Sequence, residues 1–320
     1  MLEKIKIYTS LSGEEIREIS RYKIVRFIQK LFRGDKLTDK QFLGLLFFIY
    51  RSRLMRWRSP HSFNEKMQWL KLFDRRKSTS AIVDKVEFKN YVAKRIGEEY
   101  VIPTLRVWNS PEEIDLAGLP PKYVIKCNLA SGGTYIHTGE EVPDLERIKK
   151  IVAEKFHEDT YHENGEWPYK NVSKKILAEA YIEDKSPLGI PDYKFYCFDG
   201  VPMYIQINSY RDHYFFDKEK SVVDYQVFYD MDWKRQQVIQ GYPYRNDIEV
   251  PKPMDFDKMK ELAAKLSVGF PYVRVDMYNL NGRIYAGEMT FFPYCGLYPF
   301  KPKEWDRKLG ELIRLGIGEA

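Results

Sequence analysis

The first hundred residues carry apolar side chains at the spacing of amphipathic helices. Between residues 14 and 32 the apolar positions recur every three or four residues, with Arg and Lys between them. This pattern predicts one or two amphipathic helices that end at Gly34. The apolar positions that define the pattern are Ile16, Ile19, Ile24, Phe27, Ile28 and Leu31.

Three further helices are expected before residue 98. Thr38 is a suitable N-terminal cap for the apolar run "FLGLLFFIY" at 42–50, which predicts a core helix. The segment "SPHSFNEKMQWLKLFDRR" at 59–76 predicts a turn and then a capped helix, and "VDKVEFKNYVAKRIG" at 83–97 predicts a helix closed by Gly97. The helix within 59–76 would carry Met67, Leu70 and Phe73 on one apolar stripe.

Beyond Val101 the apolar pattern changes to short runs that are typical of β-strands. Asp-Gly at 199–200 and Asn-Gly at 281–282 are turn signals that would join such strands into hairpins. Helices are still expected at 143–156 and 255–267, so the pattern predicts a mixed α+β fold. The predicted strands lie in "YVIKC", "KILAEAYI", "YKFYCFDG", "PMYIQIN", "YVRVDMYN" and "RIYAGEMTF".

Chain length, net charge and cysteine spacing indicate how many subdomains to expect and which kinds of partner and site the sequence disfavours. A chain of 320 residues exceeds the usual single-domain size, so we expect two or three subdomains. The net charge of +6 permits an anionic partner, but the chain lacks the strong imbalance and the basic stripe of a nucleic-acid-binding protein. We therefore expect no nucleic-acid partner. Cys127, Cys197 and Cys295 lie far apart without a Cys-x-x-Cys pair, which favours a reducing compartment over a disulfide framework or a zinc site.

The N-terminal sequence bears on cellular location. It has no apolar signal region followed by a small-residue cleavage site, which favours a cytoplasmic protein. The longest apolar run, at 42–50, is roughly half of what a bilayer span needs. The basic and apolar helices of this region could nevertheless lie on an anionic membrane surface at the inner face of the membrane. The alternative is an ordinary solvated face over the protein's own core.

The stretch "YVIKCNLASGGTYI" at 123–136 places a lysine within a strand. Lys126 shares a face with Val124, opposite Ile125 and Cys127, and a loop with Gly132 and Gly133 follows. A lysine in a buried strand needs an anion to compensate its lost solvation. A lysine beside exposed backbone N–H groups is a recurrent phosphate-binding arrangement, although two glycines after a strand also occur in a plain hairpin.

A second candidate site lies in "VRVDMYNLNGRIYAGEMTFFP" at 273–293. The pattern predicts a hairpin with Arg274 and Asp276 on one face of the first strand, and Glu288 and Thr290 on one face of the second. Two carboxylates on neighbouring strands beside an arginine would suit Mg²⁺ next to phosphate oxygens. The alternative is a cross-strand charge pair on a solvent-facing sheet.

These motifs, in this order, resemble the ATP-grasp enzymes. The strand "VIKCN" with its Ser-Gly-Gly loop, "LAEAYIED", "DYKFYCFDG" and a final "RVD" and "GEMTF" carry the likeness, and "FNEKMQWLKLFDRR", "IPTLRVW" and "EIDLAGLP" are similar to the TupA-like branch of surface-polysaccharide biosynthesis. The resemblance covers roughly residues 55–315. It implies a mainly helical region at 1–98, followed by two α+β subdomains, 99–182 and 183–320, that grip ATP between them.

The resemblance also implies a set of residues that bind ATP. Phosphates would meet Lys126, Lys194 and either Lys85 or Lys89, beneath a mobile flap formed by Ser131, Gly132 and Gly133. Glu179, Ala180, Tyr181 and Ile182 would form the adenine hinge, with the backbone of Ala180 and Ile182 reading the base edge. Either Glu183 or Asp192 would bind the ribose.

The same resemblance implies a metal-binding and catalytic end. Asp276 and Glu288 would hold Mg²⁺, and Arg274 would stabilise the transferring phosphoryl group. Thr290 stands where most ATP-grasp enzymes have an asparagine, and its hydroxyl is a weaker metal ligand than an amide oxygen. The TupA-like branch commonly has threonine there, so Thr290 remains the expected third ligand.

The activity that the resemblance implies is carboxylate–amine ligation. ATP would phosphorylate a carboxylate, and an amine would displace phosphate from the acylphosphate to form an amide or peptide bond. The expected partners are a uronic acid or sugar-linked acceptor and an amino compound, in modification of a bacterial surface polysaccharide. Two other classes stay open: a glycosyltransferase-like enzyme using "DMD" at 230–232, and a nonenzymatic nucleotide- or polysaccharide-binding module.

Residues 203–245 are dense in aromatic and charged side chains and could line an acceptor pocket. Aromatic planes stack on sugar faces, and arginine or lysine pairs with carboxylates. An aromatic hairpin that covers one face of a sheet is the alternative. The candidate pocket residues are Arg211, His213, Asp230, Trp233 and Lys234.

Overall fold

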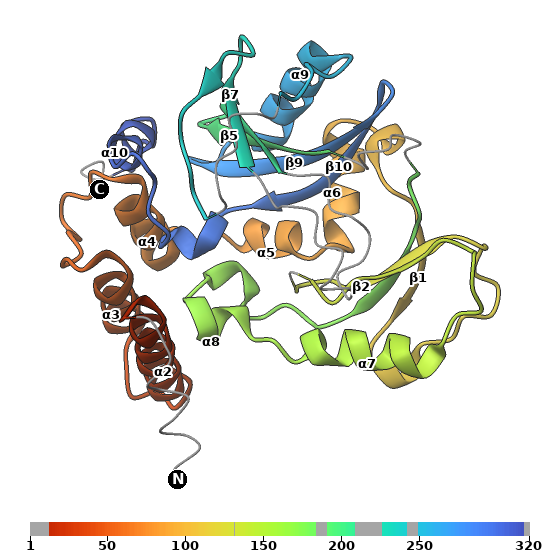
Figure 1. Cartoon of the computed structure of the whole chain (residues 1–320), viewed down its shortest axis with the longest axis horizontal. Coiled ribbons are helices and arrows are strands. Elements are labelled where there is room, and N and C mark those ends of the chain that lie inside the picture. The colour runs from red at the N-terminus through yellow and green to blue at the C-terminus, as the bar shows by residue number, and fades with distance from the viewer. Residues whose placement is uncertain (1–12, 131, 184–190, 209–225, 242–248, 317–320) are drawn as a thin grey trace.

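The computed structural model describes residues 13–130, 132–183, 191–208, 226–241 and 249–316. The elements form two antiparallel sheets, several helices packed on them, and a helical N-terminal region (Figure 1). The α+β class and the helical N-terminal region predicted from the sequence are confirmed. None of the helices in the described residues has both the length and the apolar character that a bilayer span requires.

The larger sheet has six strands in the order β10-β9-β5-β6-β7-β8. Helix α9 (Phe256–Ser267) packs on its central strands. Asp199–Gly200 and Asn281–Gly282 all have positive φ, as the two predicted hairpin turns require. The strands are β5 (Asp192–Phe198), β6 (Val201–Asn208), β7 (Gln226–Asp230), β8 (Arg235–Gln236), β9 (Val273–Leu280) and β10 (Arg283–Thr290).

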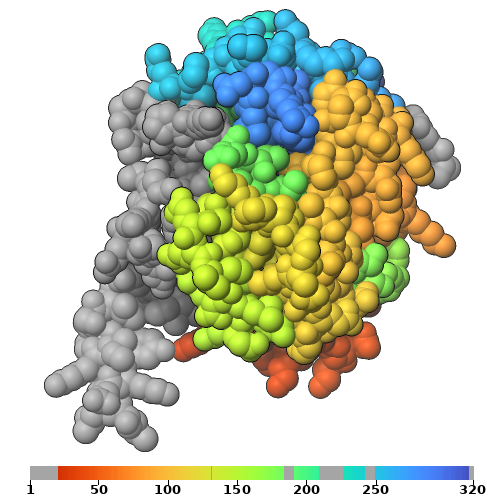
Figure 2. Space-filling view, turned by 90° about the vertical axis from the view of Figure 1, so that its right-hand side faces the viewer, coloured from red at the N-terminus to blue at the C-terminus, as the bar shows by residue number. Residues whose placement is uncertain are grey.

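The smaller sheet has four strands in the order β1-β4-β2-β3. Helix α7 (Leu145–Phe156) packs on β2 and closes a separate core that contains Ile125, Ile148 and Ile176. In Figure 2 this part of the chain, in yellow and yellow-green, lies below the cyan and blue elements of the larger sheet. The strands are β1 (Thr104–Trp108), β2 (Tyr123–Cys127), β3 (Tyr135–His137) and β4 (Ile176–Ala180).

The predicted helix caps of the N-terminal region are confirmed. The Thr38 and Ser62 hydroxyls each accept a hydrogen bond from the N–H three residues on, and Gln41 and Glu65 reach back to complete two capping boxes. The helices are α2 (Gly13–Arg33), α3 (Asp39–Arg51), α4 (Phe63–Phe73), α5 (Lys77–Val83) and α6 (Glu87–Arg95), with α8 (Thr160–Asn164) and α10 (Glu304–Glu311) later in the chain. Short 3₁₀ turns lie at Glu98–Tyr100, Pro111–Glu113, Trp167–Tyr169 and Pro293–Gly296.

Two details of the helical pattern were predicted wrongly. Among residues 21–33 of α2 the buried side chains are Val25, Ile28 and Phe32, whereas Ile24 and Phe27 are 51% and 62% exposed. The side chains of Ile16 and Ile19 lie outside the described part of the chain. The helix has two apolar stripes, and only one of them packs on the protein. On α4, Phe73 is 52% exposed because it lies in the last turn, where it contacts the Trp69 ring instead of the core.

Helices α4, α5 and α6 contribute to the core of the larger sheet. Phe63 and Met67 of α4 and Phe88 and Val92 of α6 are buried together with side chains of β5 and β9. Helices α4 to α6 therefore support the larger sheet even though they precede the smaller one in sequence. The division of the chain at residues 98 and 182 stays a prediction.

Candidate active site

The edge of the larger sheet carries one row of charged side chains across three strands. Lys194 on β5 pairs in register with Asp276 on β9, and Asp276 pairs with Glu288 on β10. A register shift at Gly287 inserts an extra residue into β10, and this bulge sets Glu288 directly opposite Asp276. A glycine fits there because a Cβ would lie 3.0 Å from the Tyr278 ring and 3.3 Å from the Asp276 carbonyl oxygen.

Arg274 organises this row by donating to the carboxylates and the hydroxyl around it. Its Nε and Nη2 donate to the two oxygens of Asp276, both at 2.7 Å, and Nη2 also donates to the Thr290 hydroxyl at 3.0 Å. Lys194 Nζ donates to Asp276 Oδ2 at 2.6 Å and pairs with Asp192. The structure thus brings together the residues predicted for the metal-binding and catalytic end, Lys194, Arg274, Asp276, Glu288 and Thr290, and places Asp192, a candidate for the ribose, beside Lys194.

Glu288 and Arg274 of this row are held in their ionised forms, whereas burial raises the pKa of Asp276. Burial raises the pKa of Glu288, but the charges of Lys85, Lys194 and Arg274 outweigh it and lower the pKa to about 2. Burial lowers the pKa of Arg274, yet Asp276 raises it well above its usual value. At neutral pH the sheet edge therefore presents carboxylates and cations side by side.

Lys126 has a carboxylate partner within the fold. Its Nζ lies 2.5 Å from Glu179 Oε2, and Lys89 Nζ lies 2.8 Å from Glu179 Oε1. Burial raises the pKa of Glu179, but the two lysine charges lower it below its usual value. Glu179 is on β4, where it is in register with Val124, so its side chain shares a sheet face with Lys126. Glu179 is thus the anion that compensates this strand lysine.

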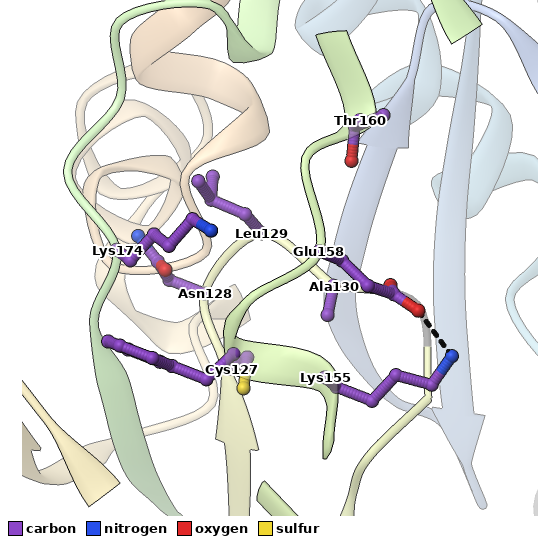
Figure 3. A pocket seen from close by; sticks show the side chains of 9 residues that line it. Cys127, Asn128, Leu129, Ala130, Lys155, Glu158, Thr160 and Lys174 are labelled. Carbon is purple, nitrogen blue, oxygen red and sulfur yellow. Dashed lines mark hydrogen bonds and ion pairs between the residues drawn. The ribbon is translucent and has the colours of Figure 1, made fainter. Parts of the chain in front are cut away.

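Lys85 contacts the loop that follows β2 and contains Gly132 and Gly133. Lys85 Nζ donates to the Ala130 carbonyl oxygen at 3.0 Å, and burial lowers the pKa of Lys85. Gly133 has φ +64° and packs on α7, where a Cβ would lie 2.5 Å from Lys155 Cγ. Figure 3 shows Lys155 beside Ala130, turned toward Glu158, with which it forms an ion pair of 2.5 Å. Ser131 lies outside the described residues.

A cavity of about 520 Å³ joins the two groups of charged residues. Its lining comes from both sheets: Lys126 from the smaller one, and Lys194 and Glu288 from the larger one. Several of the predicted site residues line it together, namely Lys85, Lys126, Gly132, Asp192, Lys194, Arg274, Asp276, Glu288 and Thr290.

A further wall of this cavity was not predicted from the sequence. Glu158, Glu163, Glu166 and Tyr169 line it, from the segment between α7 and β4. Their sequence context, "HEDTYHENGEWPYK", has neither strand nor glycine-loop character, so no pattern marked them as neighbours of Arg274. The wall adds three carboxyl groups to the lining of the cavity.

Glu166 stands out within this wall. It is only 7% exposed, and burial raises its pKa to about 7 despite the charge of the fully buried Lys71 nearby. Lys71 Nζ donates instead to the carbonyl oxygens of Asn164 and Cys295, at 2.7 and 2.9 Å. Burial, together with the charges of Glu166 and Glu288, raises the pKa of Tyr169 well above its usual value.

The predicted adenine hinge lies outside the lining of the cavity. Ala180 donates its N–H to the Pro103 carbonyl oxygen at 2.9 Å, so of its two backbone groups the carbonyl is the better placed to meet a base. Glu183 pairs with Lys122 at 2.9 Å, and both side chains are about half exposed. Tyr181 and Ile182 follow β4 without regular structure. Of the two candidates for the ribose, Asp192 lines the cavity and Glu183 does not.

The described part of residues 203–245 contributes β6, β7 and β8 to the larger sheet, and β7 and β8 form a hairpin. Asp230 accepts hydrogen bonds from the N–H groups of Asp232 and Lys234, at 3.1 and 2.9 Å, which fixes "DMD" as a tight turn. Trp233 stacks on Tyr229 with ring centroids 4.6 Å apart. Arg211 and His213 lie outside the described residues.

Two carboxylates and a hydroxyl are the groups available for a metal ion. Within the described ranges, no cluster of three or more His, Cys, Asp and Glu side chains could hold one. Asp276, Glu288 and Thr290 line one cavity, and carboxylate and hydroxyl oxygens are the ligand type that Mg²⁺ prefers. Both oxygens of Asp276 accept hydrogen bonds from Arg274 or Lys194, so a metal ion would share them with these cations. Mg²⁺ usually keeps several waters and uses one or two carboxylates beside phosphates, so this donor set fits it.

Comparison with known proteins agrees with the order of the motifs. The family described as TupA-like ATPgrasp matches residues 65–314. No match is found among curated proteins.

Several solved structures are similar at low sequence identity. They include a D-alanine–D-alanine ligase from Bacillus anthracis complexed with ATP (15% identity, TM-score 0.35, 66% of this chain and 54% of that chain). Another is the ATP-grasp ligase PsnB complexed with minimal precursor, Mg and ADP (14% identity, TM-score 0.37, 71% of this chain and 57% of that chain). A third is a D-Ala-D-Ala ligase from Helicobacter pylori (14% identity, TM-score 0.40, 79% of this chain and 67% of that chain). The chain spans only 54% to 67% of the length of these structures.

Proposed function

Since the chain belongs to the TupA-like ATP-grasp family, we propose that it is an ATP-dependent ligase that joins a carboxylate to an amine and releases ADP and phosphate. The observation that carries this proposal is the single cavity lined by Lys126 and Lys194 on two different sheets, with Arg274 and Glu288 beside them. Distributed cations next to carboxylates suit a polyphosphate and its metal ion.

Each charged residue would have a distinct part in binding. Lys85 and Lys126 would neutralise the α and β phosphates, and Asp276 and Glu288 would hold Mg²⁺, with Thr290 as a third oxygen. When bound, Mg²⁺ would supply positive charge to the phosphate oxygens. For Lys126 to meet phosphate, it must share or exchange its pairing with Glu179, and Lys89 remains to neutralise that carboxylate.

The chemistry would need positioning and charge neutralisation without a covalent nucleophile on the protein. A substrate carboxylate oxygen would attack the γ-phosphorus, and the bond to the β-phosphate oxygen would break to release ADP. Arg274 would stabilise the transferring phosphoryl group. The amine nitrogen would then attack the acyl carbon, and phosphate would leave.

The acidic wall supports the amine half of the reaction. Glu163 and Glu166 line the same cavity as Arg274, so they would attract an ammonium group to the place where the acylphosphate forms. Glu166, whose pKa is about 7, is suited to accept the proton that the amine must lose. An amino compound is therefore the second substrate that this cavity favours.

The wider assignment rests on the family. We propose a uronic acid, an amino acid or a sugar-linked group of a bacterial surface polysaccharide as the substrate class, with the reaction in the cytoplasm. A glycosyltransferase is the weaker alternative, because "DMD" at 230–232 is a tight turn outside the lining of the cavity. A nonenzymatic binding module would have no need of Arg274 beside two carboxylates.

A product assay tests the proposal. Purified protein is incubated with Mg-ATP and a panel of uronic acids, amino acids and amino sugars, and the nucleotide products are separated. Phosphoryl transfer to a carboxylate predicts ADP for at least one pair, and a hydroxamate when hydroxylamine replaces the amine. Arg274→Met should lower turnover far more than ATP affinity. Release of AMP and pyrophosphate, or full turnover by Arg274→Met, would refute the mechanism.

A further inference from the structure

Helix α2 exposes a surface that the proposed reaction does not use. Residues 21–33 contain five basic side chains and no acidic one. Within this segment the side chains of Val25, Ile28 and Phe32 are buried, and most of the others are exposed to solvent. In Figure 1, α2 and α3 lie together at one end of the molecule, away from both sheets.

The exposed surface of α2 is divided into a basic and an apolar sector. At 100° per residue, Lys23, Arg26 and Lys30 fall within one 60° sector, and Arg33 lies next to it. Ile24 and Phe27 fall in a neighbouring sector, with large exposed fractions of 51% and 62%. The helix therefore has a second amphipathic pattern outside its contact with the protein.

Helix α3 adds exposed apolar side chains to the same region. Phe48 on α3 and Leu54 just after it are 50% and 78% exposed. Isolated exposed apolar residues are common on soluble proteins, but Ile24 and Phe27 adjoin a basic sector on the same helix, and the neighbouring α3 and the residues after it expose two more apolar side chains. This combination of cations and apolar side chains calls for a binding partner that offers both anionic groups and an apolar phase.

We propose that α2 and α3 bind the surface of an anionic lipid bilayer. Ile24 and Phe27 would enter the boundary between headgroups and acyl chains, and Lys23, Arg26 and Lys30 would bind the anionic headgroups. A second copy of this chain fits this surface less well, because its own basic sector would repel the basic sector of α2. An anionic bilayer complements both sectors.

Vesicle co-sedimentation of the full chain tests the proposal. The protein should sediment with vesicles of phosphatidylcholine and phosphatidylglycerol (3:1) but not with phosphatidylcholine alone, and 0.5 M NaCl should release most of it. Each Lys or Arg is worth roughly fivefold in binding, so Lys23→Gln/Arg26→Gln/Lys30→Gln should weaken it at least tenfold. Ile24→Ser/Phe27→Ser should also weaken binding about tenfold or more.

Matched controls remove the same chemistry from other exposed sites. Lys252→Gln/Lys258→Gln/Lys265→Gln removes three cations around α9, and Val142→Ser/Val268→Ser removes two exposed apolar side chains. Both controls should bind vesicles like the unmodified protein. Unchanged thermal unfolding of the α2 variants would show that the fold is intact.

Three results would overturn the proposal. The first is no sedimentation of the unmodified protein with anionic vesicles, and the second is equal binding by the α2 variants and the controls. The third is a dimer in lipid-free solution that the α2 variants dissociate, which would assign this surface to a second copy of the chain.

Discussion

At the residue scale, Lys126 shows how one side chain can serve both the fold and a ligand. Within the described chain its ammonium is compensated by Glu179, which also binds Lys89. Two lysines for one carboxylate leave an excess positive charge beside the cavity. A buried ion pair of this kind adds little to stability by itself, but losing one partner is costly.

The first prediction concerns the coupling between these side chains. Glu179→Gln should lower the free energy of unfolding by about 3 kcal/mol, because two lysines lose their carboxylate. Lys126→Met should cost less, since Lys89 still neutralises Glu179. Urea unfolding of both single variants and the double variant should give a coupling energy of about 1 kcal/mol or more. Strictly additive losses would mean that the pair is not energetically linked.

The second prediction uses the raised pKa of Glu166. Its pKa rises from 4.5 to about 7 on folding, mainly through burial, so the folded state holds this proton more tightly than the unfolded chain. Below about pH 4.5 Glu166 is protonated in both states, and its titration does not lower the free energy of unfolding. As the pH rises to 7 and beyond, its ionisation in the unfolded chain lowers the free energy of unfolding progressively. The loss reaches about 3 kcal/mol, at 1.36 kcal/mol for each pKa unit.

Glu166→Gln isolates this effect because it keeps the shape and removes the titration. The stability of the variant relative to the unmodified protein should rise by about 3 kcal/mol between pH 4.5 and pH 8, measured by urea unfolding. Glu146→Gln, on an exposed part of α7, is the control and should show no such change. A stability difference that is independent of pH would contradict the assignment.

At the element scale, the alternation of strands predicted much of the site. The face shared by Arg274 and Asp276, and the one shared by Glu288 and Thr290, follow from a period of two within each strand. The pairing of Asp276 with Glu288 depends in addition on the bulge at Gly287. A bulge sets register between strands, and strand alternation carries no information about register.

The third prediction concerns the loop after β2. Gly132→Ala and Gly133→Ala both place a side chain at positive φ, but only Gly133 has its missing Cβ 2.5 Å from Lys155 on α7. Each variant should lose about 1 kcal/mol for the backbone conformation. Gly133→Ala should lose a further 1–3 kcal/mol in thermal unfolding, since α7 must move. Equal losses in the two variants would show that the loop does not rest on α7.

At the scale of the whole molecule, the family could be predicted from the sequence, but the packing of distant elements against one another could not. The ordered motifs identified the TupA-like ATP-grasp family, and the family match over residues 65–314 confirms it. No local pattern could show that α4 to α6 pack under the larger sheet, because such packing depends on contacts between distant residues. The same holds for Glu166, which reaches the cavity from a segment without periodic character.

The final prediction follows from a cavity that spans two separately packed sheets. Lys126 lines the cavity from the smaller sheet, and Glu288 lines it from the larger sheet. If ATP lies across the cavity, its binding must need both side chains. At one hundred times Kd, a ligand raises the free energy of unfolding by about 2.7 kcal/mol, or roughly 5 °C in Tm for a chain of this size. Mg-ATP should produce this shift in the unmodified protein.

Lys126→Met and Glu288→Gln should each abolish the shift, measured against the same variant without nucleotide so that any change in intrinsic stability cancels. Lys150→Met and Glu146→Gln remove the same charges from exposed positions on α7 and should retain the full shift. Loss in the Lys126 variant alone would restrict ATP to the smaller sheet, and loss in the Glu288 variant alone would restrict it to the larger one. Either result would contradict a nucleotide held between the two sheets, because a ligand that bridges them loses affinity when its contacts on either side are removed.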